Sequence, residues 1–115
     1  MRYVVCVGWI AGLCLTAAPS SAADSVGIGH PGDCGKWVAA RKEGGSRSWQ
    51  HETWLLGYLS GLAVGLGVEF WGAKGRRLSN EAVELYVDKW CANNPLGLPW
   101  QAADRLFEEH TGRRP

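Results

Sequence analysis

Residues 49–71 read WQHETWLLGYLSGLAVGLGVEFW and form the most strongly patterned segment of the chain. No charged residue lies between Glu52 and Glu69, and the large apolar residues recur at steps of three and four, which is the spacing of an α-helix. These recurring residues are Trp54, Leu55, Tyr58, Leu59, Leu62 and Leu66. We therefore expect a central helix that ends between Gly65 and Gly72, where glycines accumulate.

Three glycines within this segment, Gly57, Gly61 and Gly65, are spaced four residues apart. On a helix they would line one side, and each would cost about 1 kcal/mol relative to alanine. Close packing of another backbone against this strip would offset the cost, so we expect the three to be helix-packing residues. The alternative is a transmembrane dimerisation helix. We favour a buried helix, because the uncharged run falls short of the roughly 17 to 25 residues that span a bilayer.

The first 23 residues have the features of an export signal. Arg2 provides a positive start, residues 3–15 are mainly apolar, and small residues precede Ala22 and Ala23, after either of which signal peptidase would cut. Neither Cys6 nor Cys14 follows a small residue, as a lipid-modified cysteine would. We therefore expect an exported, soluble product with no membrane insertion after cleavage.

The charge of the mature chain argues against some classes of partner. The whole chain has 12 basic and 11 acidic residues, and cleavage removes Arg2, so the mature product is formally neutral. Nucleic acid and anionic membranes would favour clustered lysine and arginine. Neither is an expected partner.

The sequence also lacks a recognisable catalytic motif. His51 and Glu52 begin like the zinc-protease motif HExxH, but Leu55 occupies the position of the second histidine. Ser60 superficially resembles the serine of GxSxG, yet residue 58 is tyrosine, so we interpret Ser60 as a small packing residue that bonds to its own helix. We expect a protein that is not an enzyme.

Signal cleavage leaves two cysteines, Cys34 and Cys91, in a protein sent to an oxidising compartment. They do not form a CxxC motif, and the three histidines show no ligand spacing to them. We therefore expect one structural disulfide, no metal and no cofactor.

The remaining segments predict three more helices. Asp33 can cap a helix over residues 34–43, residues 44–48 break it, and Ser48 can cap the central helix. Ser79 can cap a third helix, which residues 93–95 stop.

A fourth helix would start at Pro99 or Trp100 and end at Gly112. No strand pattern occurs. The expected fold is all-α, a bundle of about four helices over residues 34–112, closed by one disulfide and preceded by a flexible tail over residues 24–33.

Two loops are candidates for contact with a partner. The first, residues 72–79, contains a local basic cluster and could enter an acidic cleft, while the second is residues 44–49. Tryptophans at the two ends of the central helix are candidate anchors. The candidate partner-binding residues are Lys74, Arg76, Arg77, Trp71, Arg47 and Trp49.

Several segments together resemble a known family. They are CGKW at residues 34–37, WLLGYLSG at 54–61, YVDKWCANNPL at 86–96, and the pair Ala102 and Ala103. In this order, after an export signal, they resemble the Tai/Rap family of periplasmic immunity proteins, which protect bacteria from amidase toxins delivered by type VI secretion. The resemblance implies a small helical periplasmic protein with one disulfide, often a homodimer, that occludes the active-site cleft of a secreted peptidoglycan amidase.

The alternative function is a small periplasmic acid-stress chaperone with a single disulfide. Such a protein partly unfolds in acid and exposes apolar surface. The 11 carboxylate side chains would lose their charge at low pH, which leaves net positive repulsion.

Overall fold

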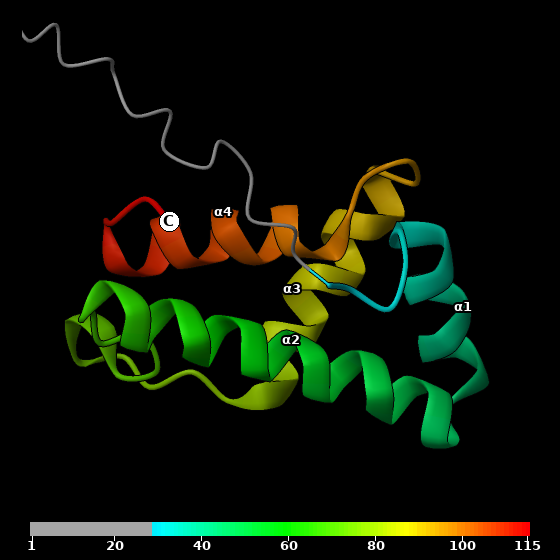
Figure 1. Cartoon of the computed structure of the whole chain (residues 1–115), viewed down its shortest axis with the longest axis horizontal. Helices are drawn as coiled ribbons and strands as arrows, with labels where there is room; N and C mark the ends of the chain where they lie inside the picture. Colours follow the sequence, from blue (N-terminus) through cyan, green and yellow to red (C-terminus); the bar gives the residue numbers. More distant parts are fainter. Residues whose placement is uncertain (1–28) are drawn as a thin grey trace, which may run out of the picture.

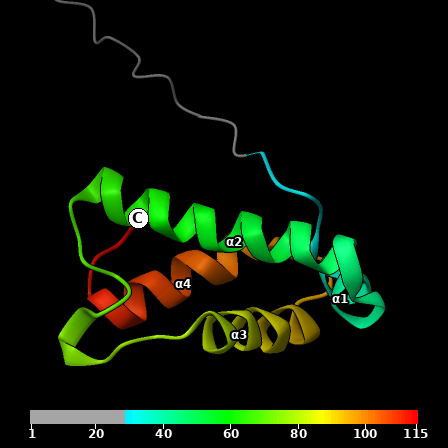
Figure 2. The ribbon, with the colours of Figure 1, turned by 90° about the horizontal axis from the view of Figure 1, so that it is seen from below.

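The computed structural model describes residues 29–115 and shows four α-helices with one short 3-10 turn. The elements are α1 (Cys34–Glu43), α2 (Gly45–Leu66), η1 (Ala73–Gly75), α3 (Asn80–Asn93) and α4 (Pro99–Thr111). Helix α2 runs the length of the bundle with α3 and α4 beside it, and α1 closes one end (Figures 1 and 2). No strand occurs within the described residues, and the predicted all-α fold is confirmed. The predicted signal peptide and residues 24–28 lie outside the described part of the chain.

Local sequence signals set most of the helix boundaries. The side chain of Asp33 accepts a hydrogen bond from the backbone N–H of Lys36, and Ser79 does the same for Ala82, so both predicted caps are confirmed. Helix α4 begins at Pro99. Left-handed glycines end α2 at Gly67 and α4 at Gly112.

The start of the central helix differs from the prediction. Helix α2 begins at Gly45, and the break after α1 is the single residue Gly44, whose φ of 73° glycine adopts without strain. Residues 44–49 are therefore not a loop, and Ser48 is not the N-cap. Ser48 is buried inside the helix and donates its hydroxyl hydrogen to Glu52.

The core lies between the inner faces of the four helices. The Cys34–Cys91 disulfide, which confirms the predicted pair, ties the start of α1 to the end of α3 with the two Cα atoms 4.9 Å apart. Phe70 stacks on Phe107 with ring centroids 5.3 Å apart, so the segment after α2 is fixed to α4. The other fully buried large side chains include Trp37, Leu55, Leu59, Val83 and Val87.

The three helix-packing glycines do not pack against anything in the described chain. Gly57, Gly61 and Gly65 are exposed, and a Cβ atom added at any of them would meet nothing within 4 Å. The buried residues of α2 are instead Ser48, His51, Leu55 and Leu59, and the other helices cover that side. The prediction of intramolecular packing through the glycines was therefore wrong.

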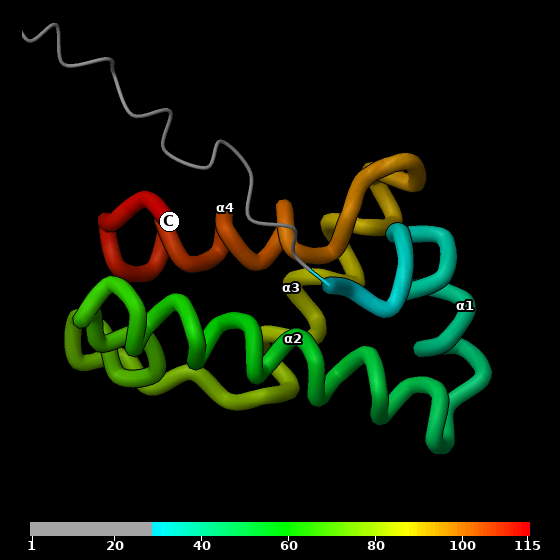
Figure 3. Tube along the Cα trace, viewed as in Figure 1, coloured from blue at the N-terminus to red at the C-terminus, as the bar shows by residue number. Residues whose placement is uncertain are grey.

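The described end of the predicted N-terminal tail lies against α2. The indole N–H of Trp54 donates to the carbonyl oxygen of Gly29 at 2.6 Å, and Gly32 is buried. Figure 3 shows this segment passing across the bundle before α1 begins.

Candidate partner-binding surface

The segment from Gly67 to Ser79 forms a loop at the end of the bundle opposite α1, as Figure 2 shows. Its base is fixed by Phe70 in the core, and by a hydrogen bond from the backbone N–H of Leu78 to the carbonyl oxygen of Trp71 at 2.9 Å. Lys74 and Gly75 both have positive φ, 55° and 69°, and turn the chain at η1. The loop is thus anchored at its base while its far side faces solvent.

The far side of this loop carries a basic cluster. Lys74, Arg76 and Arg77 are all exposed, as the sequence predicted. Among residues 29–115, no acidic side chain forms an ion pair with any of them. Three neighbouring cations therefore remain available to an acidic group on another molecule.

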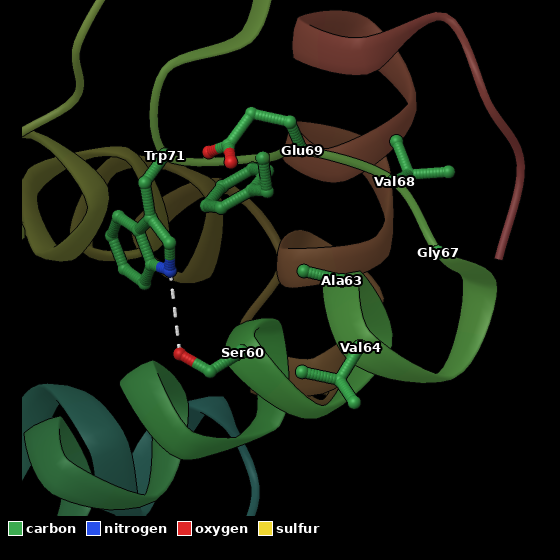
Figure 4. A pocket seen from close by; sticks show the side chains of 8 residues that line it. Ser60, Ala63, Val64, Gly67, Val68, Glu69 and Trp71 are labelled. Carbon is green, nitrogen blue, oxygen red and sulfur yellow. Dashed lines mark hydrogen bonds between the residues drawn. The ribbon is translucent and has the colours of Figure 1, made fainter.

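The sequence suggested Trp71 as an exposed anchor for a partner, but its side chain is only partly exposed. It is half-buried, and its indole N–H donates to the Ser60 hydroxyl at 3.3 Å, which joins the loop to α2 (Figure 4). Ser60 therefore accepts a hydrogen bond from the loop. An open, mainly apolar groove lies along this junction and is lined by Ser60, Ala63, Val64, Gly67, Val68, Glu69, Phe70 and Trp71.

The other two candidate residues, Arg47 and Trp49, lie far from the basic cluster. Both are in the first turns of α2, and Trp49 is 63% exposed. Arg47 pairs with Glu43 at 2.9 Å. Because a helix of 22 residues is about 33 Å long, Arg47 and Trp49 lie at the opposite end of α2 from the loop. Within one chain, the structure does not bring the six candidates together.

A second charged cluster, which the sequence did not reveal, centres on Arg41 of α1. Its guanidinium contacts Asp88 at 3.0 Å and Glu84 at 3.4 Å on α3, and it also pairs with Glu52 on α2. The indole N–H of Trp37 donates to the same Asp88 at 2.7 Å. The hydrogen bond to Asp88 is the main cause that raises the pKa of Arg41 above its usual value.

The cluster around Arg41 joins α1 to α2 and α3. Burial raises the pKa of Glu84, and the neighbouring carboxylate of Glu52 raises it further. The one sequence signal was the acidic pair Glu84 and Asp88, four residues apart on one side of a helix. Such a pair is unfavourable unless a cation from another element lies between its members.

His51 is the other buried ionisable side chain near this cluster. Burial lowers its pKa, and the positive charge of Arg47 lowers it further. Its ring and that of Trp37 pack edge to face with centroids 5.9 Å apart. In residues 29–115, no group of three or more histidine, cysteine or acidic residues is placed to hold a metal ion. None of the helices described has the length and apolar character needed to cross a membrane.

Comparisons of the chain with models of known families, with curated proteins and with solved structures found no match. The geometry of the basic loop and the residues of the chain therefore carry the functional interpretation.

Proposed function

We propose that this protein is a periplasmic immunity protein that binds a secreted peptidoglycan amidase and occludes its active-site cleft with residues 72–79. The observation that supports this proposal is the basic loop itself, which is anchored by Phe70 and presents Lys74, Arg76 and Arg77 without an ion-pair partner among residues 29–115. The protein acts by binding and performs no chemistry of its own.

Anchoring matters because a binding loop loses conformational entropy when it becomes ordered on a partner. A loop whose base is already fixed in the free protein avoids part of that cost, which amounts to about 0.5–1.5 kcal/mol for each side chain immobilised. The hydrogen bonds at Trp71 and Leu78 provide this order before binding. The three cations then accelerate encounter with an acidic cleft and orient the loop within it.

The resemblance to the Tai/Rap family supports the choice of partner. The resembling residues occupy the scaffold of the fold. Cys34 and Cys91 form the disulfide, Trp37 is in the core, and Tyr58 donates its hydroxyl hydrogen to Asp104 at 2.7 Å. These residues hold the helices of the fold together and are not expected to touch the amidase.

The partner must be identified before the proposed function can be tested. The mature protein would be tagged and recovered from envelope extracts of the bacterium that produces it, and a stoichiometric secreted amidase is the expected companion. Inhibition of peptidoglycan cleavage would then be measured with the wild-type protein and with the triple variant Lys74→Glu, Arg76→Glu, Arg77→Glu. We expect the triple variant to bind at least ~30-fold more weakly, which corresponds to about 2 kcal/mol.

The matched control reverses three other exposed cations, with Lys42→Glu, Lys89→Glu and Arg105→Glu. It changes the net charge equally, yet its residues lie on α1, α3 and α4. We expect it to inhibit like the wild type. Full inhibition by a folded loop variant would contradict occlusion of the cleft by residues 72–79, and recovery of no amidase would contradict the proposed partner.

A second candidate is the acid-stress chaperone, and the cluster around Arg41 is the observation that favours it. Three carboxylates on two helices share this one guanidinium, and protonation in strong acid would remove their charge. Suppression of the aggregation of unrelated proteins at about pH 3, with no effect at neutral pH, would support this function. A protein that stays folded and inert there would exclude it.

A further inference from the structure

Two adjoining hollows lie where α3 ends and α4 begins, at the end of the bundle that α1 closes (Figure 1). Their volumes are about 430 Å³ and 280 Å³, at the lower end of the range of about 300–1,000 Å³ found for small-molecule sites. Trp90 and Asn94 line both hollows, so a ligand longer than one hollow can continue past these residues into the other. Among residues 29–115, no acidic side chain lines either hollow.

The indole ring of Trp90 is held in a fixed position. A Cβ atom added at Gly97 would lie 2.7 Å from Cη2 and from Cζ3 of this ring, so only glycine lets the backbone approach the ring so closely. That backbone is fixed in turn. The N–H of Cys34 donates to the carbonyl oxygen of Gly97, and the N–H of Gly97 donates to that of Asn94, both at 2.9 Å. A ring that is ordered before binding loses little conformational entropy when a ligand stacks on it.

Two amide side chains that line the hollows are oriented by hydrogen bonds to the backbone. The amide nitrogen of Asn94 donates to the carbonyl oxygen of Trp90 at 2.8 Å, which leaves the amide oxygen as an acceptor. The amide oxygen of Gln101 accepts from the N–H of Leu98 at 2.9 Å, which leaves the amide nitrogen as a donor. The hollows therefore offer one oriented acceptor and one oriented donor beside an aromatic ring.

A sugar ring matches this combination of groups. Its face of C–H groups stacks on the electron-rich face of an indole, while the polar groups at its edge both donate and accept hydrogen bonds. A peptide that binds as a β-strand needs a sheet edge, and residues 29–115 contain no strand. A proline-rich peptide also stacks on aromatic rings, but proline has no N–H to donate to the amide oxygen of Asn94.

We propose that these two hollows bind a saccharide chain of N-acetylated hexosamine units, with one sugar ring stacked on Trp90. An acetamido group carries one N–H donor and one carbonyl acceptor, which complement the amide oxygen of Asn94 and the amide nitrogen of Gln101. Because the two hollows adjoin, consecutive sugar rings can occupy them.

Such a site has a consequence for where the protein acts. The glycan strands of peptidoglycan consist of N-acetylated hexosamine units, so a periplasmic protein would meet this ligand at the cell wall. That step rests on the location given in the proposed function, whereas the match between the hollows and the sugar does not. The basic loop lies at the other end of the bundle and stays free while the hollows are occupied (Figure 2).

The test is an NMR titration of the ¹⁵N-labelled mature protein with the β-1,4-linked tetramer of N-acetylglucosamine. We expect the indole N–H signal of Trp90 to shift and that of Trp49, which is 63% exposed on α2, to stay unchanged. Trp90→Leu keeps an apolar side chain against Gly97 and should weaken binding at least ~10-fold, because the stacking surface is lost. The matched control is Trp49→Leu, which also removes a tryptophan and should leave the affinity unchanged.

A second variant tests the polar contact without disturbing the fold. Gln101→Glu keeps a side-chain oxygen that accepts from the N–H of Leu98, and it removes the amide donor. We expect it to retain the wild-type stability in urea and to weaken binding of the tetramer by about 3- to 10-fold, as loss of one hydrogen bond does.

The proposal is overturned if the tetramer shifts no signal of the wild type at millimolar concentration, or if Trp90→Leu and Gln101→Glu both bind like the wild type. Equal binding of the β-1,4-linked glucose tetramer would exclude the acetamido contact. Binding of a proline-rich peptide in place of the sugar would assign the hollows to a peptide. No amidase takes part in these measurements, so failure of this proposal and failure of the proposed partner are distinguishable.

Discussion

Asp104 is a carboxylate in a half-buried position on α4, and its hydrogen-bond partner is the hydroxyl of Tyr58 on α2. Burial raises the pKa of Asp104, and the hydrogen bond from Tyr58 lowers it, with burial the larger effect. At pH values between the pKa of Asp104 in the unfolded chain and its higher pKa in the folded protein, the folded protein therefore binds more protons than the unfolded chain does. Its stability at this site falls as the pH rises through that window.

The variant Asp104→Asn should be more stable than the wild type at neutral pH, because it removes a buried charge and keeps an oxygen that accepts from Tyr58. The advantage should shrink as the pH falls through the folded-state pKa of Asp104, which burial raises above its usual value, because the wild-type carboxyl group then becomes neutral. Urea denaturation at several pH values measures this difference. Tyr58→Phe is the control: it should extend the pH-dependent window upward, because the bond that lowers the Asp104 pKa is lost. A difference that does not vary with pH would show that Asp104 is not the group responsible.

The glycines of α2 provide a second prediction at the level of single residues. Gly65 is exposed, helical and surrounded by open space, so Gly65→Ala should raise the free energy of unfolding by about 0.5–1 kcal/mol. Gly67, two residues later, has a φ of 62°. Gly67→Ala should therefore lower the free energy of unfolding by about 1 kcal/mol. Thermal denaturation of the two variants distinguishes the cases. Equal effects would mean that α2 does not end where the structure places its end.

At the level of whole helices, the limits of sequence-based prediction follow from the range of the interactions. The caps Asp33 and Ser79 act on the next three residues, so the starts of α1 and α3 could be predicted from local sequence. The recurring apolar residues Leu55 and Leu59 do lie on the side of α2 that faces the core. The role of the glycine strip could not be predicted, because the spacing of the glycines does not say what covers them. The ion pair of Arg41 with Asp88 on α3 joins residues separated by 47 positions, and local sequence patterns do not reveal such a contact.

The cluster around Arg41 is predicted to hold α1 against α2 and α3. Arg41→Met removes the one cation shared by Glu52, Glu84 and Asp88 and leaves the three carboxylates to repel each other. We expect a loss of about 2 kcal/mol, less than for a fully buried pair because the Arg41 side chain is 27% exposed. The control Arg47→Met breaks an exposed pair with Glu43 and should cost less than about 0.5 kcal/mol. Similar losses in both variants would show that the cluster adds nothing beyond a surface ion pair.

For the molecule as a whole, function is predicted to divide between the two ends of the bundle. The disulfide and the cluster around Arg41 fasten α1 at one end, while the basic loop lies at the other (Figure 2). The sequence identified the disulfide at one end but not the cluster around Arg41. At the other end it identified the candidate cations Lys74, Arg76 and Arg77, which are exposed. It could not show the distance between Arg47 and the loop, because that distance depends on where α2 begins and how far it continues.

The disulfide is expected to supply a large share of the net stability of this small domain. Cys34 and Cys91 are 57 positions apart, and closing a loop of that length restricts the unfolded chain by about 4 kcal/mol on chain-entropy reasoning. The double variant Cys34→Ser, Cys91→Ser should therefore unfold at a much lower urea concentration, with its helices retained in the absence of denaturant. A loss below about 1 kcal/mol would mean that the unfolded chain is already restricted without the cross-link.

Combining Arg41→Met with the cysteine double variant tests whether the two contacts that hold α1 depend on each other. The disulfide fixes the first residue of α1 to α3, and Arg41 fixes its last turn to the same helix. If each contact depends on the other to place α1, removing both should cost less than the sum of the separate losses, because the first loss already frees the helix. A double-mutant cycle of Arg41→Met with the cysteine substitutions measures this coupling, which we expect to be at least about 0.5 kcal/mol. Strict additivity would instead show that α1 is held independently at its two ends, with Trp37 in the core sufficient to keep it docked.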